Sequence, residues 1–284
     1  MRISIIFFLT ICLFSTLFMR CDLPKATASN DKNPLDYFYE GQKLHNFGKF
    51  DSALVLYNKA ILLTPQNAEF YYERGRVYYD LDSSKLALSD FDKAIKIDDN
   101  TSKYYHGRGM VHSEMNNFEA ALPDIRKAME LDPKNPLLHG LLGDIHLAQG
   151  DTLGALMDYE DFLALAPNNP DFHEKTAYIY YNLGQADKAL SECEKALKLN
   201  GKDADYHYLK SIILSKLNKD SQALQSIEIA MKIDPTNRKF YYLRGVLKLN
   251  LSDKSACEDL KKAADAGDES SAELMKKYCK GTVS

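Results

Sequence analysis

A period of 34 residues runs through most of this chain and constrains its fold more than any other feature. Small residues recur at one phase, in the series Gly41, Gly75, Gly109, Gly143, Ala177, Ser211 and Gly245. Two further series keep the same period, namely Ala53, Ala87, Ala121, Ala155, Ala189, Ala223 and Ala60, Ala94, Ala128, Phe162, Ala196, Ala230. No insertion interrupts the period from Asn33 to about Leu249. Independent series that stay in step in this way indicate an internal structural repeat.

Within each unit the spacing of residues predicts helices. Tyr71, Gly75 and Tyr78 stand at i, i+4 and i+7, which is one face of a helix. Glycine inside a helix costs roughly 0.5–1 kcal/mol relative to alanine, so its recurrence at one phase indicates that two helices pack closely there. Helix starts are marked by residues that favour the N-cap position: Asn33, Asn67, Thr101, Asn135, Asn169, Asp203 and Asn237. Proline follows directly at 34, 136 and 170, where its missing N–H costs nothing.

A 34-residue helix–turn–helix unit of this kind resembles the tetratricopeptide repeat. The resemblance covers about residues 34–266 and implies an all-α, right-handed α-solenoid of about seven helix–turn–helix units. Another helix is expected from about residue 269, and its charged side chains would cap the exposed end of the stack. Solenoid and capping helix together are predicted to span residues 34–280.

The sequence departs from the family pattern at three kinds of position. Tyrosine or histidine stands where the family favours tryptophan, in the series Tyr37, Tyr71, Tyr105, His139, His173, His207 and Tyr241. Phe162 replaces a small residue in the fourth unit. Pro123 falls inside the second helix of the third unit, and we expect it to delay the start of that helix or to kink it.

The N-terminus predicts export. Met1-Arg2 precedes an apolar stretch from Ile3 to Met19, which is typical of a signal or anchor segment over residues 1–20. Residues 21–33 are predicted to be a short tether. Three interpretations stay open: lipidation at Cys21, as the resemblance to bacterial lipoproteins implies, cleavage after Ala28 to release a secreted protein, or an uncleaved anchor. All three place the repeats in or beyond the cell envelope, with membrane contact through the N-terminus only.

The cysteines and histidines have simple structural explanations. Cys193 stands at an apolar phase and is interpreted as a small buried side chain. Cys257 and Cys279 form a candidate disulfide in an oxidising compartment, although spacing alone leaves their pairing open. The chain has no C-x-x-C pair, and the repeating histidines occupy the phase at which other units use tyrosine, so we expect no metal site.

Nothing in the sequence supports catalysis or nucleic-acid binding. The nucleophile-elbow, phosphate-loop and dinucleotide-binding motifs are all missing from the sequence, so we expect no enzymatic activity and no cofactor. The formal net charge is −4 and no basic block occurs, which argues against nucleic acid, because phosphate binding needs clustered lysine and arginine.

The resemblance also implies a concave surface lined by the first helices of the units. One row of that surface is Phe38, Tyr72, His106, Gly140, Glu174, Tyr208 and Tyr242, and the other is Gln42, Arg76, Met110, Asp144, Tyr178, Ile212 and Val246. All of these except Gly140, Glu174 and Val246 are the predicted partner-binding residues. The lysine and asparagine with which co-chaperone members grip a terminal carboxylate are replaced here, in the first two units by Phe38 with Gln42 and by Tyr72 with Arg76.

These patterns predict a protein–protein interaction scaffold of the cell envelope. A partner peptide or helix would bind in the concave groove through apolar and aromatic contacts. Two alternatives stay open, a structural spacer or self-associating rod and an accessory subunit of an envelope enzyme or secretion complex.

Overall fold

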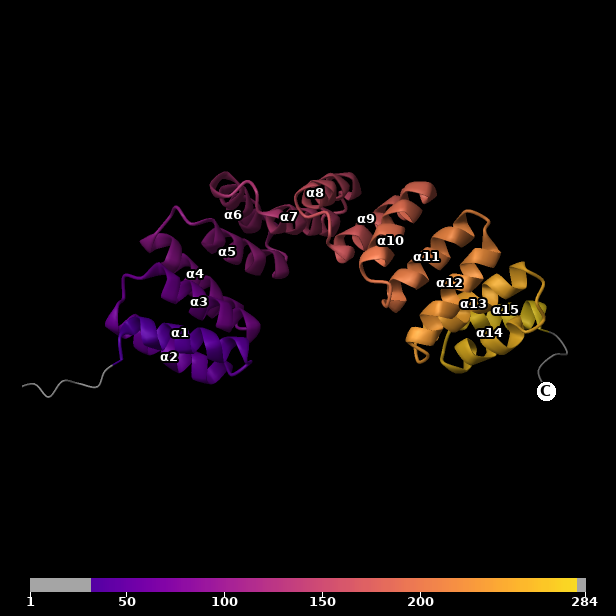
Figure 1. Ribbon diagram of the computed structural model, residues 1–284, viewed down its shortest axis with the longest axis horizontal. Coiled ribbons are helices and arrows are strands. Elements are labelled where there is room, and N and C mark those ends of the chain that lie inside the picture. Colours follow the sequence, from indigo (N-terminus) through magenta and orange to yellow (C-terminus); the bar gives the residue numbers. More distant parts are fainter. Residues whose placement is uncertain (1–31, 280–284) are drawn as a thin grey trace, which may run out of the picture.

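The computed structural model describes residues 32–279, and within that range it contains fifteen helices and no strand. Consecutive helices pair into seven units, followed by a single last helix (Figure 1). The pairs are α1 (Pro34–Asn46) with α2 (Phe50–Leu63), α3 (Ala68–Asp80) with α4 (Ser84–Ile97), α5 (Ser102–Glu114) with α6 (Phe118–Leu131), α7 (Pro136–Ala148) with α8 (Thr152–Leu165), α9 (Pro170–Asn182) with α10 (Ala186–Leu199), α11 (Ala204–Lys216) with α12 (Asp220–Ile233), and α13 (Arg238–Asn250) with α14 (Ala256–Asp265).

The whole is an arch, with α1 and α15 (Glu269–Tyr278) at opposite ends and α6 to α8 at its top (Figure 1). The predicted all-α fold with seven helix pairs and an additional C-terminal helix is confirmed. The predicted signal segment, the lipidation site at Cys21 and most of the tether lie outside the described residues. Within residues 32–279 no helix is both long enough and apolar enough to cross a bilayer.

The first helix of every unit begins at its predicted N-cap. A side-chain oxygen accepts a hydrogen bond from a first-turn backbone N–H at Asn33, Asn67, Asn135, Asn169, Asp203 and Asn237. Thr101 differs, because its hydroxyl donates to Asp98 at 2.6 Å and leaves the helix N–H groups without a side-chain acceptor. The caps therefore fix where six of the seven first helices start.

A residue with left-handed backbone ends the first helix of each unit. The positions are 34 residues apart and hold Gly48, Asp82, Asn116, Gly150, Gly184, Asn218 and Ser252, with φ between 53° and 82°. Glycine and asparagine adopt this conformation at low cost, and aspartate does so more readily than most residues. The left-handed residue turns the chain back, so that the second helix runs against the first.

The small-residue phase lies where the two helices of one unit pack most closely. A Cβ at Gly41 would lie 3.0 Å from the Tyr57 ring, and one at Gly75 would lie 2.9 Å from the Phe91 ring. Both rings are fully buried. The predicted close approach is confirmed, and its partner is the second helix of the same unit.

Pro123 does not delay the helix that contains it. Helix α6 begins at Phe118, in phase with the second helices that begin at Phe50, Ser84 and Thr152. Pro123 is the sixth residue of α6 and is exposed. Its missing N–H removes only the bond to the carbonyl of Glu119, which is in the exposed first turn, so the predicted delay is wrong.

Buried and half-buried carboxylates on the second helices are paired with basic side chains. Arg74 donates through Nε and Nη2 to both oxygens of Asp90 at 2.7 and 2.6 Å, and Arg108 holds Asp124 at 2.8 and 2.6 Å. In the seventh unit Arg244 and Lys248 both hold Asp259. In the fourth and fifth units histidine takes this role, in the pairs His146–Asp158 and His173–Glu192. The sequence analysis missed these pairs, although the arginines recur at the period of the repeat.

The C-terminal helix closes the stack through a disulfide. Cys257 in α14 and Cys279 after α15 are bonded, with their Cα atoms 5.7 Å apart. Ala256, Leu260 and Ala263 of α14 are buried. Tyr278 at the end of α15 is 53% exposed, whereas Ser271 within α15 and Cys279 just after it are buried.

Candidate partner-binding groove

Two neighbouring hollows lie on the first helices of the central units. The first has a volume of about 480 Å³ and is lined from α5, α7 and α9, including His106, Met110 and Asp144. The second has a volume of about 420 Å³ and is lined from α7, α8 and α9, including Asp144 and Tyr178. The structure thus brings together four of the predicted groove residues.

A lysine on α9 separates the two hollows. Lys175 lines both of them, and its Nζ donates to Oδ1 of Asp144 at 2.7 Å. The hydroxyl of Tyr159 donates to the same carboxylate oxygen. The Lys175 ammonium also lies 4.9 Å from the centroid of the Phe172 ring and 5.4 Å from that of Tyr159. The one cation at the centre of the groove is therefore already satisfied by an acid and two aromatic faces.

The first hollow is shaped by a large residue at one repeat position, Phe162, together with a small residue at another, Gly140. Phe162 stacks on Phe172 with ring centroids 3.5 Å apart, and a Cβ at Gly140 would lie 2.5 Å from the Phe172 ring. In other units a ring fills the position of Gly140, as Tyr72 does against Phe91 with centroids 5.7 Å apart. The departure of Phe162 from the alanine series is explained, because this large residue fills core space where Gly140 offers no side chain.

The predicted groove residues differ in accessibility. Phe38 is only 5% exposed and packs on Phe70 with ring centroids 4.9 Å apart, so it belongs to the core between units, contrary to the prediction. Tyr72 and Tyr208 are half-buried against the rings of the following unit. The half-buried group also contains His106, Gln42, Met110, Ile212 and Tyr242, whereas Arg76, Asp144 and Tyr178 are exposed.

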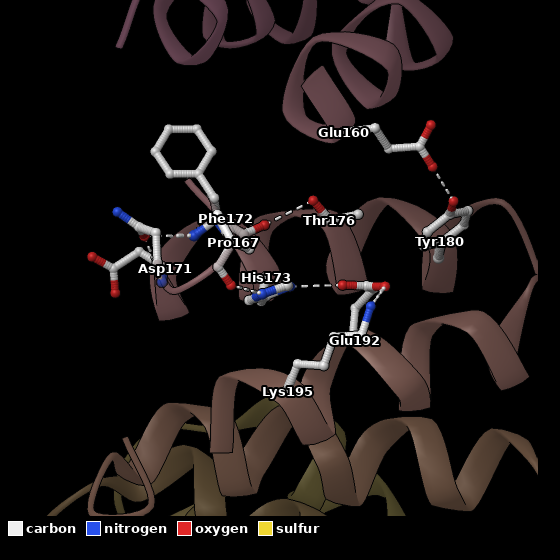
Figure 2. Close-up of polar contacts among 10 residues, drawn as sticks. Glu160, Pro167, Asp171, Phe172, His173, Thr176, Tyr180, Glu192 and Lys195 are labelled. Atoms are coloured by element: carbon white, nitrogen blue, oxygen red, sulfur yellow. Dashed lines mark hydrogen bonds and ion pairs between the residues drawn. The ribbon is translucent and has the colours of Figure 1, made fainter. Parts of the chain in front are cut away.

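The tyrosines and histidines that replace the family's tryptophan lie on the side of the first helices away from the groove, and most of them have a structural role there. His173 bonds the carbonyl of Pro167 through Nε2 at 2.9 Å and Glu192 through Nδ1 at 2.7 Å (Figure 2). The same bond, to the carbonyl six residues upstream, is made by Tyr71, Tyr105, His207 and Tyr241. Figure 2 also shows Phe172 pointing away from the His173–Glu192 pair. The ring thus fastens the turn between units to the helix that follows, which explains why tyrosine and histidine exchange here.

Burial alters the ionisation of two side chains in the groove. It lowers the pKa of His106, which therefore stays neutral at pH 7. It raises the pKa of Glu174, which lines the second hollow, and the carboxylates of Asp205, Asp203 and Asp171 raise it further. Glu174 belongs to the predicted concave row but not to the predicted contact residues, and the repeat pattern does not show whether a carboxylate is paired.

Comparison with known proteins agrees with this architecture. Four family models match the chain: one described as TPR repeat at residues 41–82, and three described as tetratricopeptide repeat at residues 68–101, 106–170 and 146–213. None of the four describes a catalytic family. No curated protein matches the chain.

Solved structures share the fold at low sequence identity. The C-terminal part of a TPR repeat-containing protein from Cytophaga hutchinsonii superposes with a TM-score of 0.67 at 16% identity, covering 83% of this chain and 98% of that one. YrrB, described as a TPR protein with an unusual peptide-binding site, superposes with a TM-score of 0.54 at 21% identity. The match covers 69% of this chain and 97% of YrrB. The APC/C hetero-tetramer Cut9–Hcn1 gives 0.62 at 18% identity and covers 76% of this chain, which spans only 43% of the chain it matches there.

The matched segments together cover more than half of the chain and lie within its helical repeats, and the segment 68–101 corresponds to the pair α3 and α4. By these matches and by its fold, this chain belongs to the tetratricopeptide repeat proteins.

Proposed function

We propose that this chain is a protein-interaction scaffold of the cell envelope that binds a segment of a partner protein along the hollows of α5, α7 and α9. The observation that carries the proposal is that the two hollows adjoin, because they share Asp144 and Lys175 as lining residues, and that together they span three units. A pair of adjoining hollows with apolar and polar walls suits an extended or helical segment better than a small molecule.

The envelope location rests on the sequence and on the disulfide. Met1-Arg2 with the apolar stretch after it is typical of export, and Cys21 is the proposed lipidation site. The Cys257–Cys279 disulfide supports this proposal, because such bonds persist mainly in oxidising compartments. Mass spectrometry of the mature N-terminus distinguishes a lipidated Cys21 from a chain that begins at Ser29, and intact Met1 in a cytoplasmic fraction would contradict export.

Crosslinking and affinity capture from native membranes test the interaction. The variant Met110→Ser/Tyr178→Ser removes one apolar contact from each hollow, and we expect it to lose the captured partners while keeping its helical circular dichroism. The matched control is Met157→Ser/Tyr39→Ser, which makes the same two replacements at exposed side chains that line neither hollow.

Retention of all partners by the groove variant would refute binding in the hollows. A change in oligomer size measured by light scattering, with partners retained, would instead support the self-associating rod.

A further inference from the structure

Glu174 has an unusual environment for a carboxylate in this protein. Among the buried and half-buried acids of residues 32–279, it alone makes no hydrogen bond and no ion pair. Buried Asp90, Asp124 and Asp259 are held by arginine, and half-buried Glu192 is held by His173 and Lys195. Shielding a charge from water without a partner is unfavourable, so this arrangement has no explanation in the folding of the chain itself.

The unpaired carboxylate lies where a partner could reach it. Glu174 lines the second hollow, whose volume of about 420 Å³ is enough for a long side chain. Tyr178 lies one helical turn further along α9, lines the same hollow and is 55% exposed. The hollow therefore offers an acid and an aromatic ring on one helix face, and both attract a cation.

The charges around the hollow disfavour an anionic occupant. Lys175 is the only cation among its lining residues, and that ammonium is bonded to Asp144. Burial raises the pKa of Glu174 most, and the carboxylates of Asp205, Asp203 and Asp171 raise it further, whereas the Lys175 ammonium lowers it. Three carboxylates against one cation make the surroundings of Glu174 negative on balance. Field and contacts thus both favour a positively charged group.

We propose that the second hollow receives an arginine or lysine side chain of the partner, with its charged end on Glu174 and its stem against Tyr178. This inference rests on the proposed function, because it names the side chain that the bound segment carries. A cation supplied by the partner would pair with Glu174, the one half-buried acid of residues 32–279 that has neither a hydrogen bond nor an ion pair, as arginine does with Asp90 inside the chain.

A labelled-peptide binding assay tests the charge requirement. The probes are fluorescein-labelled Ser-Leu-Ala-X-Ala-Leu-Ser amides in which X is arginine, citrulline or glutamate, and fluorescence anisotropy is followed with the purified full chain. We expect the arginine peptide to bind at least about tenfold more tightly than the citrulline peptide, which has the same shape without the charge. Sodium chloride should weaken the arginine peptide selectively.

Substitutions at position 174 identify the group responsible. Glu174→Gln should weaken arginine binding by about tenfold or more and leave citrulline binding unchanged. Glu174→Lys should reverse the preference toward the glutamate peptide. The control Glu194→Gln makes the same change of charge at an exposed acid on α10 that pairs with Lys210 and lines neither hollow, and it should leave all three affinities unchanged.

Equal affinity for arginine and citrulline peptides, or an arginine affinity that survives Glu174→Gln, would overturn the cation site. The cation site would also be overturned if the arginine peptide showed no detectable binding at a millimolar concentration of the protein. These outcomes leave the proposed function standing if Met110→Ser/Tyr178→Ser still loses the partners captured from membranes. Retention of those partners would instead refute the proposed function itself, so the two failures are distinguishable.

Discussion

Substitution of Gly143 by alanine tests the packing on which the repeat depends. A Cβ at this position would lie 2.5 and 2.6 Å from two carbons of the Tyr159 ring and 3.2 Å from Cβ of Asp158. Carbon atoms do not approach within 3.0 Å, and Tyr159 cannot easily move aside, because its ring is fully buried and its hydroxyl is bonded to Asp144. Overpacking of this kind costs typically 1–3 kcal/mol, whereas alanine gains about 0.5–1 kcal/mol of helix propensity. We therefore expect a net loss of about 1–2 kcal/mol.

Gly109→Ala is the matched comparison in the preceding unit. Its Cβ would lie 3.2 Å from Cγ1 of Ile125 and 3.3 Å from Cβ of Asp124, so only a few tenths of an ångström of adjustment is needed. Helix propensity offsets that small cost, and the stability should change by less than about 0.5 kcal/mol. Urea unfolding followed by circular dichroism at 222 nm measures both variants.

A second substitution shows whether the Tyr159 ring is the cause. In the sixth unit Ser211 stands at the phase of Gly143 and Ile227 at the phase of Tyr159, and both are buried. The chain itself therefore accepts a small side chain at the glycine phase where the second helix carries isoleucine in place of a ring. Adding Tyr159→Ile to Gly143→Ala should give a favourable coupling energy of at least about 1 kcal/mol in a double-mutant cycle. Equal losses for the two glycine variants, or no coupling with Tyr159, would refute the packing argument.

Three other predictions follow from the same structure. Gly109→Val should lower the melting temperature by several degrees, because its added methyl groups must enter the contact with Ile125, and an unchanged thermal melt would contradict this. Glu174→Gln should match or exceed the stability of the wild type at pH 7. The pKa of Glu174 is higher in the folded state than the value of about 4.3 expected in the unfolded state. The wild type therefore loses stability as the pH rises from about 4.3 through the folded-state pKa. The urea midpoints of the wild type and of Glu174→Gln should converge at and below about pH 4, where Glu174 is largely protonated in both states. Cys257→Ser/Cys279→Ser should lose about 3 kcal/mol, the loop entropy for a separation of 22 residues, and equal urea midpoints with and without the disulfide would be inconsistent with its role as a staple.

The period of the sequence predicts the fold because the same packing problem recurs in every unit. Each glycine of the small-residue series faces a large side chain on the next helix, and each N-cap starts a helix, so the repeated copies of the signal reinforce one another. The sequence also contains the left-handed turn series through Asp82 and Asn116, which the analysis of helix starts did not use. Only the delay expected at Pro123 failed, because one lost hydrogen bond in an exposed first turn does not move a helix start.

The candidate groove was predictable only in part. The period places Met110, Asp144 and Tyr178 on one face, and the structure puts them beside the hollows. The burial of Phe38 was missed, because whether a ring faces solvent or the next unit depends on the distance between units. The period likewise does not show which acids are paired, since the partner of a carboxylate lies on another helix.

Positions that depart from the repeat pattern are of two kinds: some are explained by packing inside the chain, and others are not. Phe162 breaks the alanine series, but its stacking on Phe172 fills the space above Gly140, so packing explains the exchange completely. Glu174 breaks a row in which most units carry a ring, and within residues 32–279 it gains neither a hydrogen bond nor an ion pair in exchange. The Lys175 ammonium attracts its carboxylate only from a distance, because that ammonium is bonded to Asp144. A departure that costs free energy and gains no contact inside the chain is expected where the missing contact comes from outside it. The half-buried carboxylate of Glu174, which lines the second hollow without a hydrogen bond or an ion pair, is therefore the observation on which the proposed recognition of a partner by charge rests.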